Sequence, residues 1–252
     1  GQQLLIYKDD GGDGNIYLST LVGESWSIPV KLGSDINSPY WEPSACLSAD
    51  GNTLYFVSDR PGGHGGRDLY SCVKLPNGDW SLATNLGPDI NTEYDEEAPF
   101  MHPDGVTLIF SSNGHNTTGG FDIFRATKKE DGVWIDIFNM GAPINTPEDD
   151  VFYVLSSDGK RAYYSTAKEN DYGEKDIYLI SLVNSIVDPV TLLTGYITFD
   201  GVHKNDRNVD ITVTDEESGQ VVQNLKPNTT TGKYVVVLTG GVGGKNYIVK
   251  YE

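Results

Sequence analysis

Three oxygen-bearing residues near the N-terminus, Asp9, Asp13 and Asn15, have the spacing of a calcium loop. Calcium loops alternate oxygen ligands along the chain and need a glycine at the sharp turn. Here Gly11 stands where the usual middle ligand would be, and glycine-rich polar loops are common between strands. The pattern favours an ordinary loop over a calcium site, and we expect no other cofactor.

No catalytic grouping is visible elsewhere in the sequence. The histidines show no HExxH spacing, and the chain has neither a G-x-S-x-G elbow nor a P-loop. The histidines are His64, His102, His115 and His203. With 36 acidic residues in the chain, any pair of carboxylates is uninformative. We therefore predict no catalytic residue and no enzymatic activity.

Composition narrows the choice of partner. The net charge of −18 argues against nucleic acid and against direct docking on anionic lipid, both of which require Lys and Arg. An acidic surface favours solubility, and we prefer that explanation to an acidic docking surface. No apolar segment approaches the roughly 20 residues of a membrane span. The two cysteines, Cys46 and Cys72, are too few for a disulfide framework or a four-cysteine metal site. Both lie in predicted strands, so we expect buried free thiols.

The elements that must carry any site repeat every 54 residues. Asp35-Ile36-Asn37 recurs at residues 89–91 and, degraded, at 143–145. The remaining markers recur in the same step, and a partial earlier copy precedes them. They are Asp50-Gly51, Asp104-Gly105 and Asp158-Gly159; Asp68-Leu69-Tyr70, Asp122-Ile123-Phe124 and Asp176-Ile177-Tyr178; and Trp80 and Trp134. A fixed period of this length indicates a solenoid, a propeller or an array.

Local pattern selects the propeller. Each Asp-Gly pair is a tight-turn signal before a β-branched and aromatic run, and no window has sustained helical spacing. Each repeat predicts four antiparallel strands, which is a propeller blade. In the second copy they lie near residues 43–48, 53–58, 68–74 and 80–86. We predict all-β blades over residues 1–184, with Trp80 and Trp134 packed between blades rather than binding a ligand.

The 54-residue repeat stops before about Val190, and a different sequence pattern follows. Short alternating strands from 190 to 252 predict a small β-sandwich, with residues 185–189 as the linker.

Two segments resemble known families. The Asp-Gly turn, the strand ending in Ser, the Gly-rich loop and Asp-Ile-Tyr resemble TolB-like, WD-type propeller repeats. Residues 195–200, Thr214-Asp215, Ser218-Gly219 and 231–234 resemble the prealbumin-like carboxypeptidase regulatory-like domain. The combination is similar to outer-membrane-protein-A family proteins of Bacteroidetes-type bacteria, some of which link type IX secretion machinery to the cell wall.

That resemblance implies a periplasmic, outer-membrane-associated scaffold with protein partners. It implies peptidoglycan contact only through a domain not found in this chain. It also implies a six-bladed propeller, of which this chain would hold a part. The first copy has the last three strands of a blade and the final copy the first three, so we expect an open blade edge.

The long loops should gather on one face of the blades, because alternate connections in an antiparallel blade emerge at the same end. Loops on a rigid scaffold carry function, and aromatic residues among acids suit a protein-binding surface. Our candidates are Tyr40, Trp41, Glu93, Tyr94, Asp95, Glu96 and Glu97. Repeat-structural packing of Tyr40 and Tyr94 is an equally weighted alternative. A propeller enzyme or a carbohydrate-binding module acting on peptide or glycan is the alternative function.

Overall fold

The computed structural model describes residues 3–22, 24–167, 175–182, 190–198, 209–227, 232–239 and 245–252. Every regular element in these ranges is a β-strand, which confirms the all-β prediction. The chain divides into two compact units. The first comprises Gly1–Ser156 and Arg161–Leu182, and the second Ser157–Lys160 and Val183–Glu252. The predicted linker, 185–189, lies outside the described residues.

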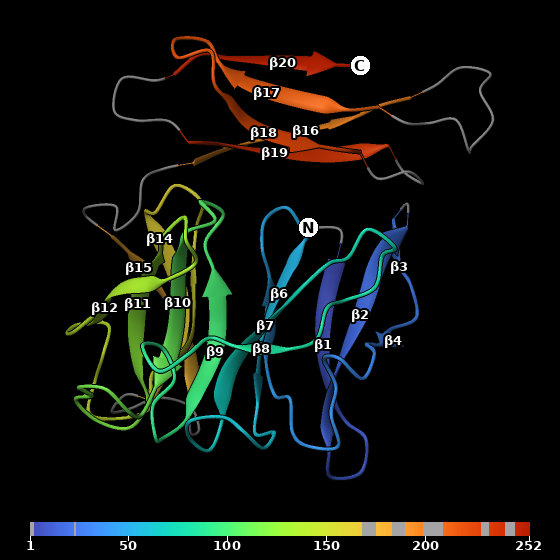
Figure 1. The fold of residues 1–252 in the computed structure, drawn as a ribbon. Coiled ribbons are helices and arrows are strands. Elements are labelled where there is room, and N and C mark those ends of the chain that lie inside the picture. The colour runs from blue at the N-terminus through green and yellow to red at the C-terminus, as the bar shows by residue number, and fades with distance from the viewer. Residues whose placement is uncertain are drawn as a thin grey trace. The chain divides into compact units, whose positions relative to one another are not determined.

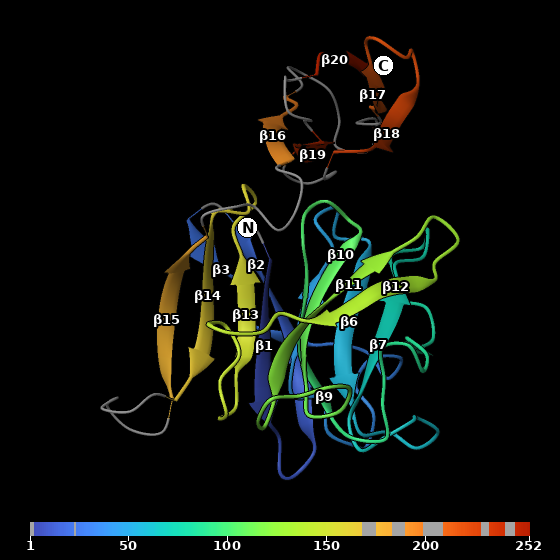
Figure 2. The ribbon, with the colours of Figure 1, turned by 90° about the vertical axis from the view of Figure 1, so that its left-hand side faces the viewer.

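The first unit contains four antiparallel sheets in chain order (Figures 1 and 2). Sheet 1 has β1 (Gln3–Asp9), β2 (Gly14–Val22), β3 (Ser25–Trp26) and β4 (Val30–Lys31). Sheet 2 has β5 (Ala45–Leu47), β6 (Thr53–Ser58), β7 (Asp68–Val73) and β8 (Thr84–Asn85). Sheet 3 has β9 (Glu96–Met101), β10 (Thr107–Ser112), β11 (Asp122–Lys128) and β12 (Trp134–Asn139). Sheet 4 has β13 (Val151–Leu155), β14 (Arg161–Thr166) and β15 (Asp176–Ser181).

We letter the strands of sheets 2 and 3 a to d in chain order. By the repeat, the strands of sheet 1 correspond to b, c and d, with β3 and β4 together as d, and those of sheet 4 to a, b and c.

Sheets 2 and 3 have all four expected strands, but strand d of sheet 2 is shorter than predicted. We expected it over residues 80–86, whereas the ladder is confined to β8 and a single bridge between Lys74 and Trp80. Between them the Ser81 hydroxyl accepts the Val73 N–H at 3.0 Å. A side-chain acceptor thus replaces a ladder carbonyl, which interrupts the strand.

Apolar side chains between successive sheets form the core. One cluster joins sheets 1 and 2 through Ile16, Leu54 and Phe56, and Trp80 packs against it. The next joins sheets 2 and 3 through Tyr55 and Leu108, and includes Trp134. Alternate residues of one strand therefore face opposite neighbours. The two tryptophans hold equivalent places between sheets, as predicted.

An asparagine in each d–a loop fastens that loop to strand c of its own sheet. In sheet 2, the Leu69 N–H donates to Asn91 Oδ1 at 2.8 Å, and Asn91 Nδ2 donates to the Leu69 carbonyl at 3.0 Å. Asn37 makes the same pair of bonds with Ile16, and Asn145 with Ile123. The amide thus pairs with strand c as a neighbouring strand would.

The isoleucine before each asparagine is buried as well. Ile36 and Ile90 are fully covered, and Ile144 is 7% exposed. The Asp-Ile-Asn motif is therefore an anchor with one apolar and one hydrogen-bonded contact.

The outer strands of the first unit are β1 and β15. Within the part of the chain that the structure describes, β1 pairs only with β2 and β15 only with β14. In Figure 2, β15 is the outermost strand of its sheet. Within the described residues, neither strand has a second partner, and an open blade edge stays a prediction.

The second unit contains two small sheets. In one, β16 (Val190–Tyr196) pairs with β19 (Lys233–Thr239). In the other, β17 (Ile211–Asp215) lies between β18 (Val221–Leu225) and β20 (Tyr247–Tyr251). Ile211, Val213 and Val236 are fully buried.

The asparagine anchor generates a stability prediction. Asn91→Ala should lower the free energy of unfolding by about 2–3 kcal/mol, because it leaves the buried Leu69 N–H and carbonyl without these partners. Asn77→Ala is the matched control: Asn77 lies in an exposed turn, and its loss should cost about 0.5 kcal/mol or less. Urea denaturation measures both. Equal losses in the two variants would contradict the anchor.

Candidate functional site

The candidate face is formed by the b–c and d–a loops, at the lower edge of the first unit in Figure 1. The short Asp-Gly a–b turns lie at the opposite end of the sheets. This is the arrangement expected for antiparallel four-stranded repeats. The loops of sheets 1 to 3 contribute the predicted residues, and the contacts beneath them determine which can meet a partner.

A buried carboxylate lies under each d–a loop. Glu96 is fully buried, accepts the Thr92 N–H at 3.0 Å and the Thr92 hydroxyl at 2.8 Å, and also accepts the Ser112 hydroxyl at 2.8 Å. Burial raises the pKa of this carboxyl above its ordinary value, against the effect of its hydrogen bonds. Glu42 and Asp150 hold the equivalent places. The placement of Glu96 on a partner-binding surface is therefore wrong: its side chain bonds the loop to strand b.

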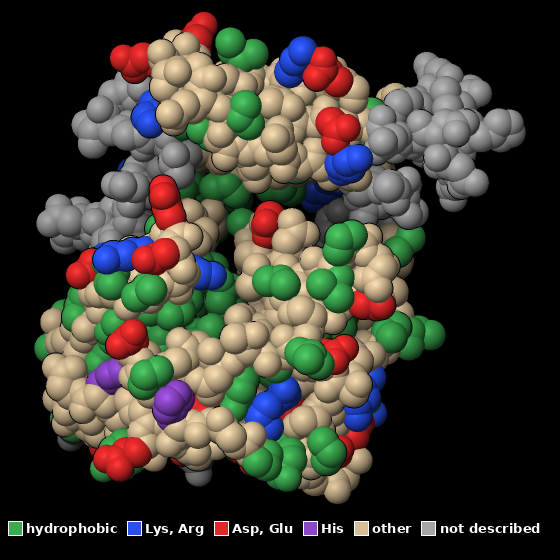
Figure 3. Space-filling view, in the orientation of Figure 1, with side chains coloured by type: hydrophobic (Ala, Val, Ile, Leu, Met, Phe, Trp, Pro, Cys, Tyr) green, Lys and Arg blue, Asp and Glu red, His purple; other side chains and the backbone are tan. Residues whose placement is uncertain are grey.

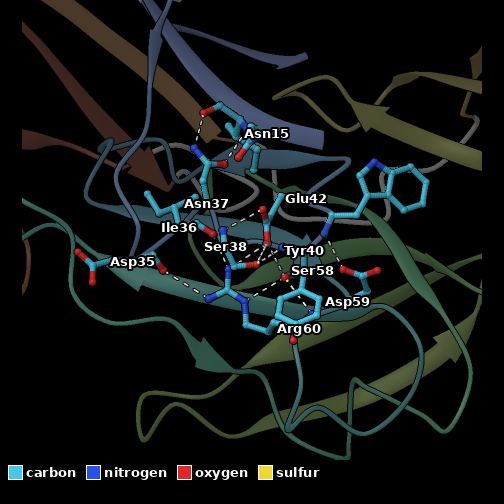
Figure 4. A network of polar contacts seen from close by, with 12 residues as sticks. Asn15, Asp35, Ile36, Asn37, Ser38, Tyr40, Glu42, Ser58, Asp59 and Arg60 are labelled. Atoms are coloured by element: carbon cyan, nitrogen blue, oxygen red, sulfur yellow. Dashed lines mark hydrogen bonds and ion pairs between the residues drawn. The ribbon is translucent and has the colours of Figure 1, made fainter. Parts of the chain in front are cut away.

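A cation or an imidazole closes the loop over an aromatic pair in two of the sheets. Figure 4 shows the polar contacts of the first, in which Arg60 lies among Ile36, Glu42 and Ser58. The Arg60 guanidinium lies 5.0 Å from the Phe56 ring and 5.1 Å from the Tyr70 ring, and pairs with Glu42 at 3.3 Å. It also donates to the Ile36 carbonyl. In sheet 3, His115 Nε2 lies 2.9 Å from the equivalent Ile90 carbonyl, over Phe110 and Phe124. Both side chains thus have structural partners.

Two loops dock so closely that they require glycine. A Cβ on Gly65 would lie 2.0 Å from the Tyr94 carbonyl oxygen, and one on Gly119 would lie 2.2 Å from that of Pro147. The Gly66 N–H donates to the Tyr94 carbonyl at 3.0 Å. The Gly-rich b–c loop therefore holds the backbone on which Tyr94 is displayed.

The repeat is broken around Arg67. At the position of Arg67, the other sheets have Gly14, Phe121 and Lys175. The Arg67 guanidinium lies 5.3 Å from the Trp41 ring and 5.5 Å from the Phe121 ring. It pairs with Asp95 at 3.0 Å and also with Glu97.

Glu97 lies beneath this group rather than on the surface. It is 8% exposed, and burial raises its pKa although Arg67 acts to lower it. Its placement among directly contacting surface residues is therefore wrong. Asp95 remains partly accessible, with its side chain 31% exposed. Sequence reasoning missed Arg67, although its departure from the repeat was a readable signal.

Three large aromatic residues remain exposed on this face. Tyr40 is 43%, Trp41 37% and Tyr94 53% exposed. Their backbones are fixed: the Ser38 hydroxyl accepts the Tyr40 N–H, and the Thr92 hydroxyl accepts the Tyr94 N–H. Trp41 is held further by its indole N–H, which donates to the Tyr7 hydroxyl at 3.0 Å. Glu93 is exposed beside Tyr94. Figure 3 shows hydrophobic and acidic side chains interspersed on the surface of this unit.

Two of the calcium candidates, Asp9 and Asn15, make hydrogen bonds within their own loop. Asp9 Oδ1 accepts the N–H groups of Gly11 and Gly12 at 2.9 and 2.8 Å, and these bonds lower the pKa of Asp9. Asn15 is fully buried and donates to the Asp13 carbonyl at 2.5 Å. Among the residues that the structure describes, no cluster of three His, Cys, Asp or Glu side chains could hold a metal ion.

The thiols lie among core side chains. Both cysteines are free, and burial raises the pKa of Cys46 to about 12 and that of Cys72 to about 11. Such thiols carry little thiolate at neutral pH and are weak nucleophiles.

Known proteins with similar structures have varied activities. A putative TolB from Agrobacterium tumefaciens is 17% identical, with a TM-score of 0.46 over 96% of this chain and 72% of that one. An endo-arabinase from Bacteroides thetaiotaomicron is 14% identical, with a TM-score of 0.42 over 72% of this chain and 75% of that one. A periplasmic gluconolactonase from Pseudomonas aeruginosa is 11% identical, with a TM-score of 0.37 over 99% and 85%.

A TolB protein is thus among the structures to which the chain is similar, at an identity that leaves its activity open. No family model matches the chain, and no curated protein matches it. The resemblances to the outer-membrane-protein-A family and to the carboxypeptidase regulatory-like domain therefore stay predictions. In the described part of the chain, no helix is long and apolar enough to cross a membrane.

The ion pairs of Arg67 generate a pH-dependent prediction. Arg67→Met should destabilise the fold by about 2 kcal/mol at pH 7, because it leaves the Glu97 carboxylate buried without its cation. A raised carboxyl pKa gives stability that is complete below the ordinary value of 4.5 and is lost as pH rises through the folded-state value. The penalty of Arg67→Met should therefore be small near pH 4 and grow toward pH 7.

The double variant Arg67→Met/Glu97→Gln supplies the control. It removes the titrating group, so its stability relative to wild type should change less with pH than that of the single variant. Urea denaturation across this pH range measures the difference. A penalty for Arg67→Met that does not change with pH would contradict the buried pair.

Proposed function

We propose that this chain is a non-enzymatic, partner-binding scaffold module of a periplasmic, outer-membrane-associated complex. In this proposal the four sheets are blades of a β-propeller, and the second unit is a β-sandwich of the carboxypeptidase regulatory-like kind. The type IX secretion machinery is the setting that the sequence resemblance suggests. Cell-wall tethering would come from a different domain.

The observation that carries the proposal is the display of Tyr40, Trp41 and Tyr94 on loops fastened from below. Exposed aromatic side chains with fixed backbones lose little conformational entropy on binding, and Tyr and Trp are enriched among binding hot spots. The repeat explains how the loops are fixed. It does not cover the Tyr40 and Tyr94 rings, which supports the binding interpretation over repeat-structural packing, whereas the Trp41 ring is partly covered by Arg67.

The chemistry around the rings favours a basic, extended partner segment. Glu93 is exposed beside Tyr94, and Asp95 keeps part of its carboxylate accessible beside Arg67. A Lys or Arg side chain could stack on an aromatic face while it pairs with these carboxylates. The net charge of −18 would steer such a segment toward the protein from a distance.

Structural roles for the acidic residues support a non-enzymatic function. Glu42, Glu96 and Asp150 recur at one repeat position with the same kind of hydroxyl and N–H partners, so the fold accounts for them. The alternative, a propeller enzyme acting on peptide or glycan, needs non-repeated polar residues at the face, and Arg67 is such a residue. Hydrolysis of either substrate by the purified chain would overturn the proposal.

Tyr94→Ala should weaken capture of the partner about thirtyfold, the loss expected of an anchor worth about 2 kcal/mol, and Tyr40→Ala should weaken it less. Binding should also weaken as salt rises. The measurement is quantitative affinity capture from envelope extract, followed by calorimetry with the partner that is identified. Val106→Ala is the matched control, because Val106 is 44% exposed beside an a–b turn at the opposite end. If Val106→Ala lost capture and Tyr94→Ala kept it, the binding site would lie on the a–b turn side, and the assignment to the loop face would be contradicted.

A further inference from the structure

A glycine-rich loop lies between the two exposed tyrosines of the loop face. Residues 61–66, Pro-Gly-Gly-His-Gly-Gly, belong to the b–c loop of sheet 2, and all six are exposed. We call them the glycine strip. On one side of it, the Trp41 N–H donates to Asp59 Oδ1 at 2.6 Å. On the other side, the Gly66 N–H donates to the Tyr94 carbonyl at 3.0 Å. The strip therefore runs from the loop of Trp41 to the loop of Tyr94.

The glycine strip is a fixed surface with few side chains. The His64 N–H donates to Asp68 Oδ2 at 2.6 Å and the Gly65 N–H to Asp68 Oδ1 at 3.2 Å, so a buried carboxylate holds the strip from beneath. A Cβ on Gly62 would meet no atom of the described residues within 4 Å, so they leave this side of the strip open. A backbone without side chains lets another chain approach closely. An extended segment can therefore lie along the strip, with one end near each tyrosine.

Of the segments that proteins commonly bind, a polyproline II helix suits this face best. Strand addition requires the open edge of a sheet, whereas this face consists of loops. An amphipathic helix requires a continuous apolar groove, whereas Glu93 and Asp95 stand on either side of Tyr94 in the chain. A polyproline II segment is recognised by exposed aromatic rings, which this face supplies at Tyr40 and Tyr94.

The backbone of such a segment can also be recognised. The carbonyls of polyproline II make no internal hydrogen bonds and so accept from a partner. Tyr40 and Tyr94 are fixed through their backbone N–H groups, and among the described residues no contact occupies either phenol hydroxyl. Both hydroxyls can therefore donate to the carbonyls of a bound segment.

Arg67 shows how this face holds a cation. Its guanidinium lies 5.3 Å from the Trp41 ring and 5.5 Å from the Phe121 ring, and pairs with Asp95 at 3.0 Å. Glu93 and Tyr94 present a further carboxylate and ring, adjacent in the chain and both exposed. An arginine can stack on a ring and pair with a carboxylate at once, because its guanidinium is planar, whereas a lysine ammonium is a point charge. The face therefore favours arginine as the basic residue of the partner.

We propose that the partner segment of the loop face is rich in proline, contains arginine, and lies along the glycine strip as a polyproline II helix. The inference rests on the proposed function and specifies the conformation and side chains of the partner. A proline packs on the Tyr40 ring, and an arginine stacks on the Tyr94 ring and pairs with Glu93. Three residues of polyproline II make one turn of about 9 Å, so residues three apart fall on the side of the segment that faces the strip.

The test is the affinity of the full chain for labelled synthetic peptides, measured by fluorescence anisotropy. The first peptide has three Arg-Pro-Pro triplets. The second has three Arg-Ala-Ala triplets, with the same length and charge but without the backbone restriction that proline imposes. Wild type should bind the proline peptide about tenfold more tightly, because a segment already held in its bound conformation loses less entropy on binding. A peptide of Lys-Pro-Pro triplets should bind about threefold more weakly than the Arg-Pro-Pro peptide.

Variants of the chain locate the peptide. Tyr94→Ala should weaken binding of the Arg-Pro-Pro peptide about thirtyfold and Glu93→Gln about threefold. Val106→Ala, on the a–b turn side, should leave binding unchanged. All three replace exposed side chains, so each should melt as wild type does. Binding of the Arg-Pro-Pro peptide that Tyr94→Ala leaves unchanged overturns the inference, because the peptide then lies elsewhere.

The inference and the proposed function fail in different ways. Equal affinity for the Arg-Pro-Pro and Arg-Ala-Ala peptides overturns the inference and leaves the proposed function standing. So does capture from envelope extract that depends on Tyr94, when the Arg-Pro-Pro peptide does not bind. Binding of that peptide through Tyr94, when envelope extract supplies no partner, supports the peptide specificity and overturns the scaffold role.

Discussion

The paired hydrogen bonds between an asparagine amide and strand c are the contact on which the loop face depends. A d–a loop connects strand d of one sheet to strand a of the next sheet. Asn91 fixes that path by bonding both the N–H and the carbonyl of Leu69, while Ile90 is buried beside it. The loop thereby gains the hydrogen bonds that an additional strand would have made, although its backbone is irregular.

The buried carboxylates extend this arrangement by one step. Once Asn91 is placed, the chain turns at Thr92, whose N–H and hydroxyl both donate to Glu96. Glu96 also accepts the Ser112 hydroxyl and so joins the loop to strand b. Several donors surround this buried carboxyl group, which is the condition for burying such a polar side chain. The result is a firm platform from which Tyr94 projects, and rigidity below is what makes the exposed ring available for binding.

The repeat and the strands could be predicted from the sequence, but the solvent exposure of individual acidic residues could not. Asp-Gly turns and tryptophans recurring at one interval located the sheets, because turn chemistry is local. Whether Glu96 and Glu97 meet water depends on Ser112 and Arg67, which lie 16 and 30 residues away in the chain. Glu42, one repeat before Glu96, was the available sign that the position is structural. The interruption of strand d in sheet 2 follows from a single hydroxyl, at Ser81, that no periodicity reveals.

Repetition also explains why neighbouring residues of one strand are buried against different sheets. Phe56 belongs to the cluster between sheets 1 and 2, whereas Tyr55 belongs to the cluster between sheets 2 and 3. A sheet that lies between two others therefore needs apolar side chains on both of its sides. In sheet 4, Tyr163 and Ile177 are 52% and 80% exposed, yet they stay apolar at the positions of the fully buried Ile109 and Ile123. The repeat therefore determines the residue type at these positions more closely than the burial of each copy does.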